Sequence, residues 1–476
     1  MTSVELFFGL NYGNNVLSAR KKYLSSADIS LAWYACWREI VLSRRCRIVY
    51  RGLIFSLIAL VVSIPIVSAR QYSLRSMSAQ ETPGVIWERS FGGPHGDVCY
   101  DLIEVSTGGY ALTGHTGCIS GWECKIWLVR LDSEGNMLWN QTFRHKANPE
   151  QLVGQSLLEC ADGGFAITGY GFVSVATHYE LNLLRTDSDG NQLWNKTYGQ
   201  GEFYDIVQCS DGGFALFGST ERPGGIGNDD FYLVRTDSDG NTLWNYTYGG
   251  TEADLARRDG LVLCDDGGFA MIGVTYSYGS ETEVLLVRTD SSGDLLWYQT
   301  YGGTGRQSGS CLLETDSGFI IAADASVTGP WMIHTDADGN VISEHEYLSY
   351  ASWHRSSAIG WADSMVRCSN GGYAIVGTGY AGLEEGSWLL RIDDGGYYIW
   401  DNFYSRDSGC WLWAIIESSE GGFVVAGSTA GDGWIMRVAD QPIISANNLI
   451  AGAVGIGFAF FVGVFVLRRR DKWPGL

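Results

Sequence analysis

Proline is scarce in this sequence, at 8 of 476 residues, and basic residues are scarce through its long middle. Residues 81–467 contain 18 Lys and Arg against 49 Asp and Glu. A domain this acidic repels polyphosphate, so we expect no nucleic-acid partner. The 63 glycines follow no Gly-X-Y period, and a hydrophobic content of 45% is too high for a disordered chain. Collagen-like and unfolded classes are therefore excluded.

The common catalytic and metal-binding motifs are also missing. The sequence has no GxSxG, no P-loop, no HExxH and no GxGxxG between a strand and a helix. A repeated Asp-Ser-Asp-Gly-Asn resembles the start of a calcium loop, but position 12 from Asp187 is Tyr198 instead of the required Glu. We therefore expect these acids to shape hairpin turns. The sequence predicts no metal, no cofactor and no particular catalytic residue.

Two uncharged runs flank the acidic middle. Four arginines at 44–51 precede residues 53–69, which end in Val67-Ser68-Ala69, the pattern of a signal peptide. Residues 1–52 are either a mis-assigned start or a cytoplasmic segment before an uncleaved anchor. Residues 449–467 are 19 residues without charge, about 28 Å as a helix, followed by Arg468-Arg469-Arg470. We expect a single-pass protein of the cell membrane with its middle extracellular and its C-terminus cytoplasmic.

The middle of the chain repeats with a period near 50 residues. A Gly-Gly-aromatic element, once degenerate, recurs seven times at spacings of 55, 49, 55, 50, 54 and 50 residues, starting at residues 108, 163, 212, 267, 317, 371 and 421. A second element of the type LVRTDSDGNTLWN, at 233–245, follows the first six copies, though weakly in some. Self-similarity at this period predicts propeller blades or solenoid turns.

Four strand-length runs per repeat favour the propeller. In the third repeat these are 203–209, 214–220, 231–236 and 242–248, joined in pairs by short Gly-rich turns. The seventh repeat lacks a fourth run, and residues 85–91 (VIWERSF), before the first repeat, match the missing strand. We therefore predict an all-β, seven-bladed propeller of four-stranded blades, closed by the N-terminal strand. A β-solenoid is the alternative, but it normally has shorter repeats.

An Asp, a Gly and a downstream Trp recur at one spacing in the second element. The best copies are Asp132/Gly135/Trp139, Asp187/Gly190/Trp194, Asp237/Gly240/Trp244 and Asp290/Gly293/Trp297. Over about residues 81–440 this pattern resembles the quinoprotein-type (PQQ-like) propeller repeat of bacterial and archaeal surface proteins. The resemblance implies that these residues dock neighbouring blades. The pattern departs from the family by lacking the Thr before the Gly, and the sequence has no clear quinone site.

These patterns divide the chain into seven segments. They are the extension 1–52, a signal peptide or anchor helix at 53–69, a linker at 70–84, the propeller at 85–440, a stalk at 441–448, a transmembrane helix at 449–467 and a basic tail at 468–476. Small residues at 451, 455, 459 and 463 form one stripe of the C-terminal helix, which makes a weak homodimer a hypothesis.

The cysteines and the sequons give further candidates. Cys118 and Cys124 lie in one long loop and are predicted to form a disulfide, whereas Cys160, Cys209, Cys264 and Cys368 occupy one repeat slot and are predicted to be buried core residues. Candidate glycosylation sites are Asn140, Asn195 and Asn245, although Asn and Thr there also fit a plain repeat consensus.

Function is predicted only as a class. The favoured reading is a membrane-anchored binding, adhesion or interaction scaffold whose partner is a protein or a glycan, with no catalysis evident. The alternatives are a surface glycan-processing hydrolase and a quinoprotein-like redox protein. Irregular loops at one end of the blades are predicted to bind the ligand. Candidate ligand-binding residues are Trp122, Tyr276, Tyr278, Trp331, Trp353 and Trp361.

Overall fold

The computed structural model describes residues 10–12, 15–17 and 83–440, the last range except 119–122, 145–150, 174–177, 222–228, 304, 326–328, 348–359, 382–383 and 407–408. The chain divides into two units, Met1–Gln80 and Glu81–Leu476. The described part of the first is a hairpin of β1 (Leu10–Tyr12) and β2 (Asn15–Leu17). Among the residues so described, no helix has the length and apolarity needed to cross a bilayer. The predicted membrane segments 53–69 and 449–467 lie outside the described residues. The same holds for residues 70–82, the stalk, the basic tail and the small-residue stripe. Residues 1–52 lie outside them too, apart from β1 and β2.

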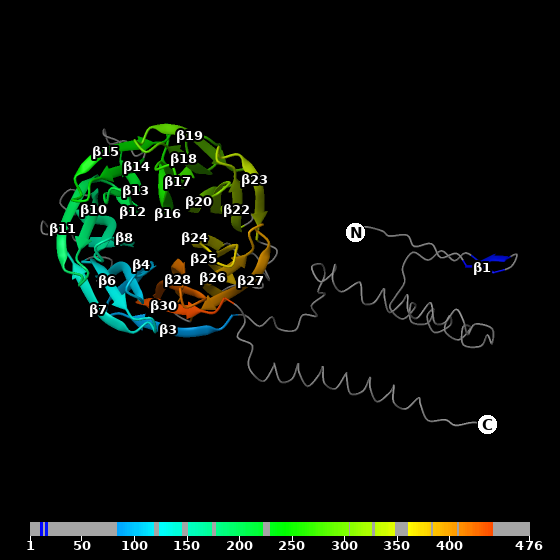
Figure 1. The fold of residues 1–476 in the computed structure, drawn as a ribbon, viewed down its shortest axis with the longest axis horizontal. Helices are drawn as coiled ribbons and strands as arrows, with labels where there is room; N and C mark the ends of the chain where they lie inside the picture. The colour runs from blue at the N-terminus through cyan, green and yellow to red at the C-terminus, as the bar shows by residue number, and fades with distance from the viewer. Residues whose placement is uncertain are drawn as a thin grey trace, which may run out of the picture. The chain divides into compact units, whose positions relative to one another are not determined.

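The second unit is a ring of seven four-stranded antiparallel sheets, as predicted (Figure 1). The innermost strands of blades 1 to 7 are β4 (Gly96–Glu104), β8 (Gln151–Glu159), β12 (Glu202–Gln208), β16 (Asp254–Leu263), β20 (Gln307–Thr315), β24 (Gly360–Arg367) and β28 (Cys410–Glu417). The second strands are β5 (Tyr110–Cys118), β9 (Phe165–Val173), β13 (Phe214–Glu221), β17 (Phe269–Thr275), β21 (Gly318–Ala325), β25 (Tyr373–Ala381) and β29 (Phe423–Thr429).

The third strands are β6 (Lys125–Leu131), β10 (His178–Thr186), β14 (Asp229–Thr236), β18 (Glu283–Thr289), β22 (Gly329–Thr335), β26 (Glu384–Ile392) and β30 (Asp432–Val438). The outermost are β7 (Met137–Phe143), β11 (Gln192–Gln200), β15 (Thr242–Tyr248), β19 (Leu295–Tyr301), β23 (Val341–Glu346), β27 (Tyr398–Ser405) and, in blade 7, β3 (Val85–Phe91). The second and third strands are almost wholly buried, because each sheet is covered by its neighbours on both sides.

The hydrophobic core lies between neighbouring blades. Seven clusters of buried side chains fill these spaces, and the cluster between blades 3 and 4 contains Phe217 and Phe231 of one sheet and Met271 and Leu285 of the next. The buried repeat cysteines 160, 209, 264 and 368 are free thiols, as predicted.

The repeated Gly and Trp residues dock the blades onto one another. Gly240 has φ 74°, and a Cβ built on it would lie 2.6 Å from the Trp194 ring of the preceding blade. Only glycine meets both demands, the left-handed backbone and the close approach of the ring. The Tyr198 hydroxyl donates to the Gly240 carbonyl at 2.8 Å and strengthens the same contact. The turn acids accept bonds within the turn, for example from Asn241 to Asp237 at 2.7 and 2.8 Å, as expected for residues that shape hairpins.

The ring is closed by β3, which pairs with β30 over the register Val85↔Val438 to Phe91↔Gly433. The Trp434 indole N–H donates to Glu88 of β3 at 2.9 Å. Ala439 N donates to the carbonyl of Gly84 at 3.1 Å, so the first and last described residues of the propeller lie side by side.

The propeller has two unlike ends. We call the end that carries the turns between first and second and between third and fourth strands, such as 105–109 and 132–136, the uniform-turn face. The opposite end, with connections such as 276–282, is the variable-loop face. The antiparallel strand order separates the two sets of connections in this way. Because Val85 pairs with Val438 at the end of β30, the first and last strands of the described propeller, β3 and β30, begin and end at the uniform-turn face.

Candidate functional site

A β-bulge occupies the same place in every innermost strand. The register against the second strand shifts at Tyr100, Gln155, Tyr204, Ser310, Asp363 and Trp413, one unpaired residue in each of six blades. In blade 4 the shift lies between Ala256 and Leu261, so that four residues face one on the partner strand. Bulges redirect side chains and often border functional sites. Because these strands surround the propeller axis, the bulges form a ring around it (Figure 1).

The three extra residues of blade 4 carry Arg258 across the axis. Its guanidinium carbon lies 4.6 Å from the ring centre of Tyr100 and 5.8 Å from that of Trp413, both within cation–π range. It also donates to Gln155 Oε1 at 3.3 Å. Tyr100 and Trp413 belong to blades 1 and 7, across the ring from β16, whereas Gln155 belongs to blade 2 (Figure 1). The neighbouring Asp259 has φ 50°, a conformation that non-glycine residues adopt rarely and mostly at constrained sites.

Five carboxyl groups, one in each of blades 1, 3, 4, 5 and 6, have raised pKa values, and burial is the main cause in each. The pKa rises to about 7 for Asp101, about 6 for Asp259, about 8 for Asp324 and about 7 for Asp363, and it also rises well above the usual range for Asp205. Repulsion from Asp259 adds to the rise for Asp101 and Asp205.

Three of these acids have a structural role. Asp101 accepts a bond from Leu157 N at 2.7 Å, Asp205 from Leu261 N at 2.9 Å and Asp324 from Ala362 N at 2.6 Å. Each donor belongs to the innermost strand of the next blade, so these carboxyls, two on innermost strands and Asp324 on the second strand β21, hold neighbouring blades together. This structural role requires only that each carboxyl accepts a hydrogen bond, and it involves no reaction with a ligand.

Asp259 and Asp363 are the remaining candidates for ligand binding or proton transfer. The positive charge of Arg258 opposes the rise in the pKa of Asp259 and of Asp363, so it acts on both carboxyls. Asp363 Oδ2 is shielded from solvent and accepts no hydrogen bond from the described residues. A carboxyl that is partly protonated near neutral pH, beside an arginine and aromatic rings, can bind a polar ligand group or transfer a proton to it. We call Arg258, Asp259, Asp363, Tyr100 and Trp413 the axial cluster.

Aromatic side chains continue from the axial cluster toward the variable-loop face. Trp411 and Trp413 of β28 are stacked at 6.5 Å with an angle of 6° between their planes. Trp361, near the start of β24, is 47% exposed. Stacked and exposed aromatic rings are side chains that ligand surfaces commonly use.

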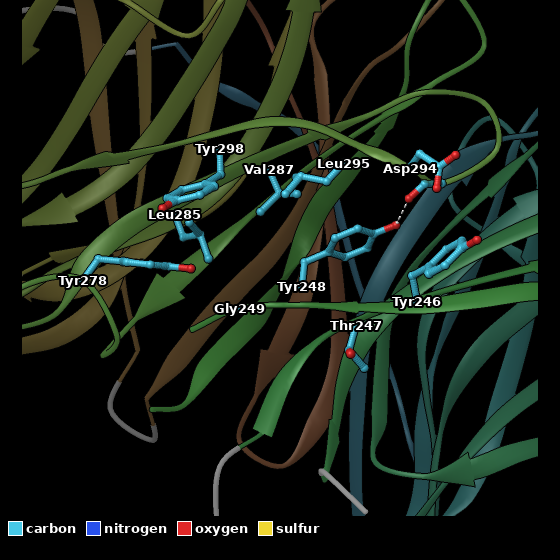
Figure 2. A pocket seen from close by; sticks show the side chains of 11 residues that line it. Tyr246, Thr247, Tyr248, Gly249, Tyr278, Leu285, Val287, Asp294, Leu295 and Tyr298 are labelled. Carbon is cyan, nitrogen blue, oxygen red and sulfur yellow. Dashed lines mark hydrogen bonds between the residues drawn. The ribbon is translucent and has the colours of Figure 1, made fainter. Parts of the chain in front are cut away.

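A second concave region lies between the outer parts of blades 3 and 4, and Figure 2 shows its lining side chains. This groove has a volume of about 320 Å³ and is rich in tyrosine. Tyr278 of the β17–β18 loop stacks on Tyr298 at 5.0 Å. Tyr248 donates to the Gly293 carbonyl at 2.6 Å, which fixes one ring of the lining. Tyr246, Tyr278 and Tyr298 stay substantially exposed and could contact a ligand.

The predicted ligand residues fall in different places. Tyr276 and Tyr278 share the β17–β18 loop, where they are 50% and 39% exposed. Trp361 belongs to blade 6, and Trp331 is half-buried against the core between blades 4 and 5. Trp122 and Trp353 lie outside the described residues.

Cys118 and Cys124 are joined as a disulfide at the variable-loop face. His115 lies beside them, and its nitrogen and the two sulfurs are within 4.8 Å of one another. Burial lowers the pKa of His115 to about 4, so this imidazole is neutral. With the sulfurs bonded to each other, the three side chains do not offer the thiolates that a metal would need.

The three sequon asparagines differ in exposure. Asn140 and Asn245 are exposed on the outer strands, whereas Asn195 is half-buried. The Asn195 amide nitrogen is shielded from solvent, and its oxygen accepts a bond from Asn182. Attachment of a glycan to Asn195 would require that nitrogen to be uncovered.

The sequence reasoning did not identify the axial cluster. The signal was present, because the first run of the fourth repeat, which contains Arg257-Arg258-Asp259, is two residues longer than the equivalent run of the third repeat. It also did not assign a role to the arginine of the second element. In the structure this residue is buried and bonds the first turn of its own blade, as Arg235 does with Asp211 at 2.6 Å.

No protein-family model matches this chain, and no curated protein matches it. Similar solved structures include a protein of unknown function from Bacteroides caccae, with 14% identity and a TM-score of 0.38 over 60% of this chain and 91% of that one. Puromycin hydrolase has 14% identity and a TM-score of 0.46 over 71% of this chain and 50% of its own. Sqt1 from Chaetomium thermophilum has 9% identity and a TM-score of 0.42 over 76% and 99%.

These scores are low, and the seven-bladed architecture therefore rests on the strand pairing of the chain itself. That pairing defines the class: the chain is a seven-bladed β-propeller scaffold of four-stranded blades closed by its N-terminal strand.

Proposed function

We propose that this propeller is a membrane-anchored extracellular binding scaffold that recognises a glycan or protein ligand on its variable-loop face. The observation that carries the proposal is the position of the chain ends, because Gly84 and Ala439 are hydrogen-bonded neighbours at the uniform-turn face. The uncharged runs 53–69 and 449–467 are connected to these two ends. An anchor at either end would therefore hold the uniform-turn face toward the membrane and direct the variable loops outward.

Two features of the variable-loop face support this orientation. Exposed aromatic side chains gather in its loops and strand ends, among them Tyr276, Tyr278, Trp361 and Tyr380. The disulfide between Cys118 and Cys124 lies in one of its loops, and disulfides persist in oxidising compartments outside the cytosol. The blades are docked by Trp and Gly, as the resemblance to quinoprotein-type surface repeats implies, and this supports the proposal of a surface propeller.

The topology is tested on the full chain in intact cells. After mild reduction, a membrane-impermeant thiol reagent should label Cys118 and Cys124 from outside, and the Cys118→Ser, Cys124→Ser double variant should lose that labelling. A C-terminal epitope tag should become accessible to antibody only after permeabilisation. Labelling that appears only in permeabilised cells would contradict the extracellular orientation.

Ligand binding is tested with the full chain in detergent on a glycan array, with a pull-down against surface proteins as the second arm. We expect Trp361→Ala and Tyr278→Ala to weaken binding about tenfold or more, as for exposed aromatic anchors of an interface. Ser238→Ala, in a turn of the uniform-turn face, should leave binding unchanged. If only the turn variant lost binding, the assignment of the faces would be wrong.

The axial cluster favours a second function, hydrolysis of a glycan. Asp363 and Asp259 have pKa values raised to about 7 and about 6, which suits a general acid and its partner carboxylate. A panel of chromogenic glycosides would reveal such activity. Asp363→Asn should then reduce turnover by about a hundredfold or more with an unchanged fold. Absence of turnover on every glycoside would leave the binding scaffold as the better proposal.

A further inference from the structure

Two buried carboxylates from neighbouring blades meet beside the tyrosine groove. Asp254 begins β16 in blade 4 and is 0% exposed, and Asp230 of β14 in blade 3 is 2% exposed. Both approach Gly249, which follows β15 and lines the groove (Figure 2). A Cβ built on Gly249 would lie 2.4 Å from Asp254 Oδ2 and 2.8 Å from Asp230 Oδ1. The two acid groups therefore converge on one small region that only a glycine leaves open.

The donors around Asp254 satisfy only one of its two oxygens. Oδ2 accepts bonds from Gly250 N at 2.6 Å and from Ser277 Oγ at 2.9 Å. Oδ1 is shielded from solvent and accepts no hydrogen bond from the described residues. A buried carboxylate oxygen without a partner is costly, and such oxygens in native proteins normally bind a donor or a cation.

The chain contains a matched pair that shows the difference. At the junction of blades 7 and 1, Asp97 and Asp432 converge on Gly92 in the same way. There both oxygens of Asp97 are occupied, Oδ2 by Gly93 N at 2.7 Å and Oδ1 by Gly117 N at 3.0 Å and the Thr116 hydroxyl. Among the described residues, no equivalent of the second pair of donors reaches Asp254 Oδ1 at the junction of blades 3 and 4. Two carboxylates thus converge at both blade junctions. Of the two equivalent acids Asp97 and Asp254, only Asp254 has an oxygen that accepts no hydrogen bond from the described residues.

We propose that the junction of blades 3 and 4 is a binding site for a divalent cation, held by Asp254 and Asp230. The hydroxyl of Ser277 and the backbone carbonyl of Glu252, 3.1 Å from that hydroxyl, are the kind of oxygen ligands that complete such a site. Calcium fits better than magnesium, because Mg²⁺ keeps several waters of its own and these carboxylates are almost wholly buried. The site is distinct from the repeated turn acids, whose oxygens are taken by bonds within the turn.

A bound ion would also shape the tyrosine groove. Ser277, which donates to Asp254, directly precedes Tyr278 in the β17–β18 loop. Tyr278 feels the charges of both Asp254 and Asp230, since these acids add to the rise of its pKa. Occupation of the site would thus fix the loop that carries one wall of the groove.

The test uses the full chain in detergent, stripped with chelator and then titrated with Ca²⁺ or Mg²⁺ during thermal unfolding. We expect Ca²⁺ to raise the melting temperature by several degrees and Mg²⁺ to raise it less. Asp254→Asn should abolish the Ca²⁺-dependent rise. Asp97→Asn, in the saturated pair, and Asp237→Asn, in a uniform turn, should keep it.

Terbium luminescence gives a readout that does not depend on stability. Tb³⁺ replaces Ca²⁺ and is sensitised by a nearby tyrosine, so the wild-type signal should fall when Ca²⁺ competes. Tyr278→Phe should lower the luminescence signal while leaving the Ca²⁺-dependent melting shift in place. This variant therefore still tests the site if Asp254→Asn fails to fold. The proposal is overturned if neither Ca²⁺ nor Tb³⁺ has an effect, if Asp237→Asn removes the shift, or if Asp97→Asn removes it as completely as Asp254→Asn.

Discussion

At the scale of single residues, an arginine that recurs in the third strand deserves the most weight. Arg235 is 9% exposed in its side chain and donates to the carbonyls of Phe214 and Thr236 as well as to Asp211. Equivalent residues make equivalent bonds in other blades, as Arg185 and Arg288 do. Each arginine joins the third strand to the first turn of its own sheet, which holds the uniform-turn face rigid.

We predict that Arg235→Met lowers the free energy of unfolding by about 2–4 kcal/mol, because two buried carbonyls lose their donor. Asp211→Asn should cost less than about 1 kcal/mol, since that carboxylate is 56% exposed and its pairing is screened by water. Denaturant unfolding of the two variants measures the difference. Equal costs would mean that the ion pair, and not the carbonyl bonds, is the stabilising part.

At the scale of elements, ring closure depends on one strand from the far end of the chain. β3 supplies the outer edge of blade 7, and Glu88 within it bonds Trp434 and pairs with Arg406. Without β3, the edge of β30 would be left open and the ring would be held on one side only.

Deletion of residues 81–92 should therefore lower the melting temperature far more than deletion of 441–476. The comparison requires both truncations in the same detergent, followed by calorimetry or circular dichroism. The first deletion removes a strand that pairs with blade 7, and the second removes no described residue of the propeller. Similar melting temperatures would show that β3 does not close the ring in solution.

At the scale of the whole molecule, the buried acids around the axis make stability depend on pH. Asp101, Asp324 and Asp363 have pKa values of about 7, 8 and 7, raised by burial from 3.8. The folded chain therefore binds more protons than the unfolded chain, and it loses them as the pH rises through these values. The buried imidazole of His115 acts in the opposite direction, but only below its ordinary pKa of 6.5.

We predict that the free energy of unfolding falls by at least about 2 kcal/mol between pH 6.5 and pH 8.5 at constant ionic strength. Asp324→Asn should flatten this fall, because the amide keeps an acceptor for Ala362 N but carries no titrating group. Melting temperatures across the range measure the effect. A stability that stays level or increases with pH would show that these carboxyls are ionised without cost in the folded protein.

Much of the fold was readable from the sequence because the repeat is local. Turn residues such as Gly240 need a backbone with positive φ, and the Trp of the outermost strand in the preceding blade needs a glycine to pack on. Both demands leave a periodic trace, so blade number, strand order and the closing strand β3 were predicted correctly. The buried repeat cysteines followed from the same periodicity.

The sites were decided by contacts between residues far apart in the chain. Arg258 meets Tyr100 and Trp413 only because the ring brings blades 1, 4 and 7 around one axis. Asp254 and Asp230 meet at Gly249 only because blades 3 and 4 are docked. Periodicity reports what every blade shares, whereas a site is built from what one blade does differently. The sequence by itself therefore determined the scaffold, and the tertiary structure decided which of its many acids and aromatic residues face one another.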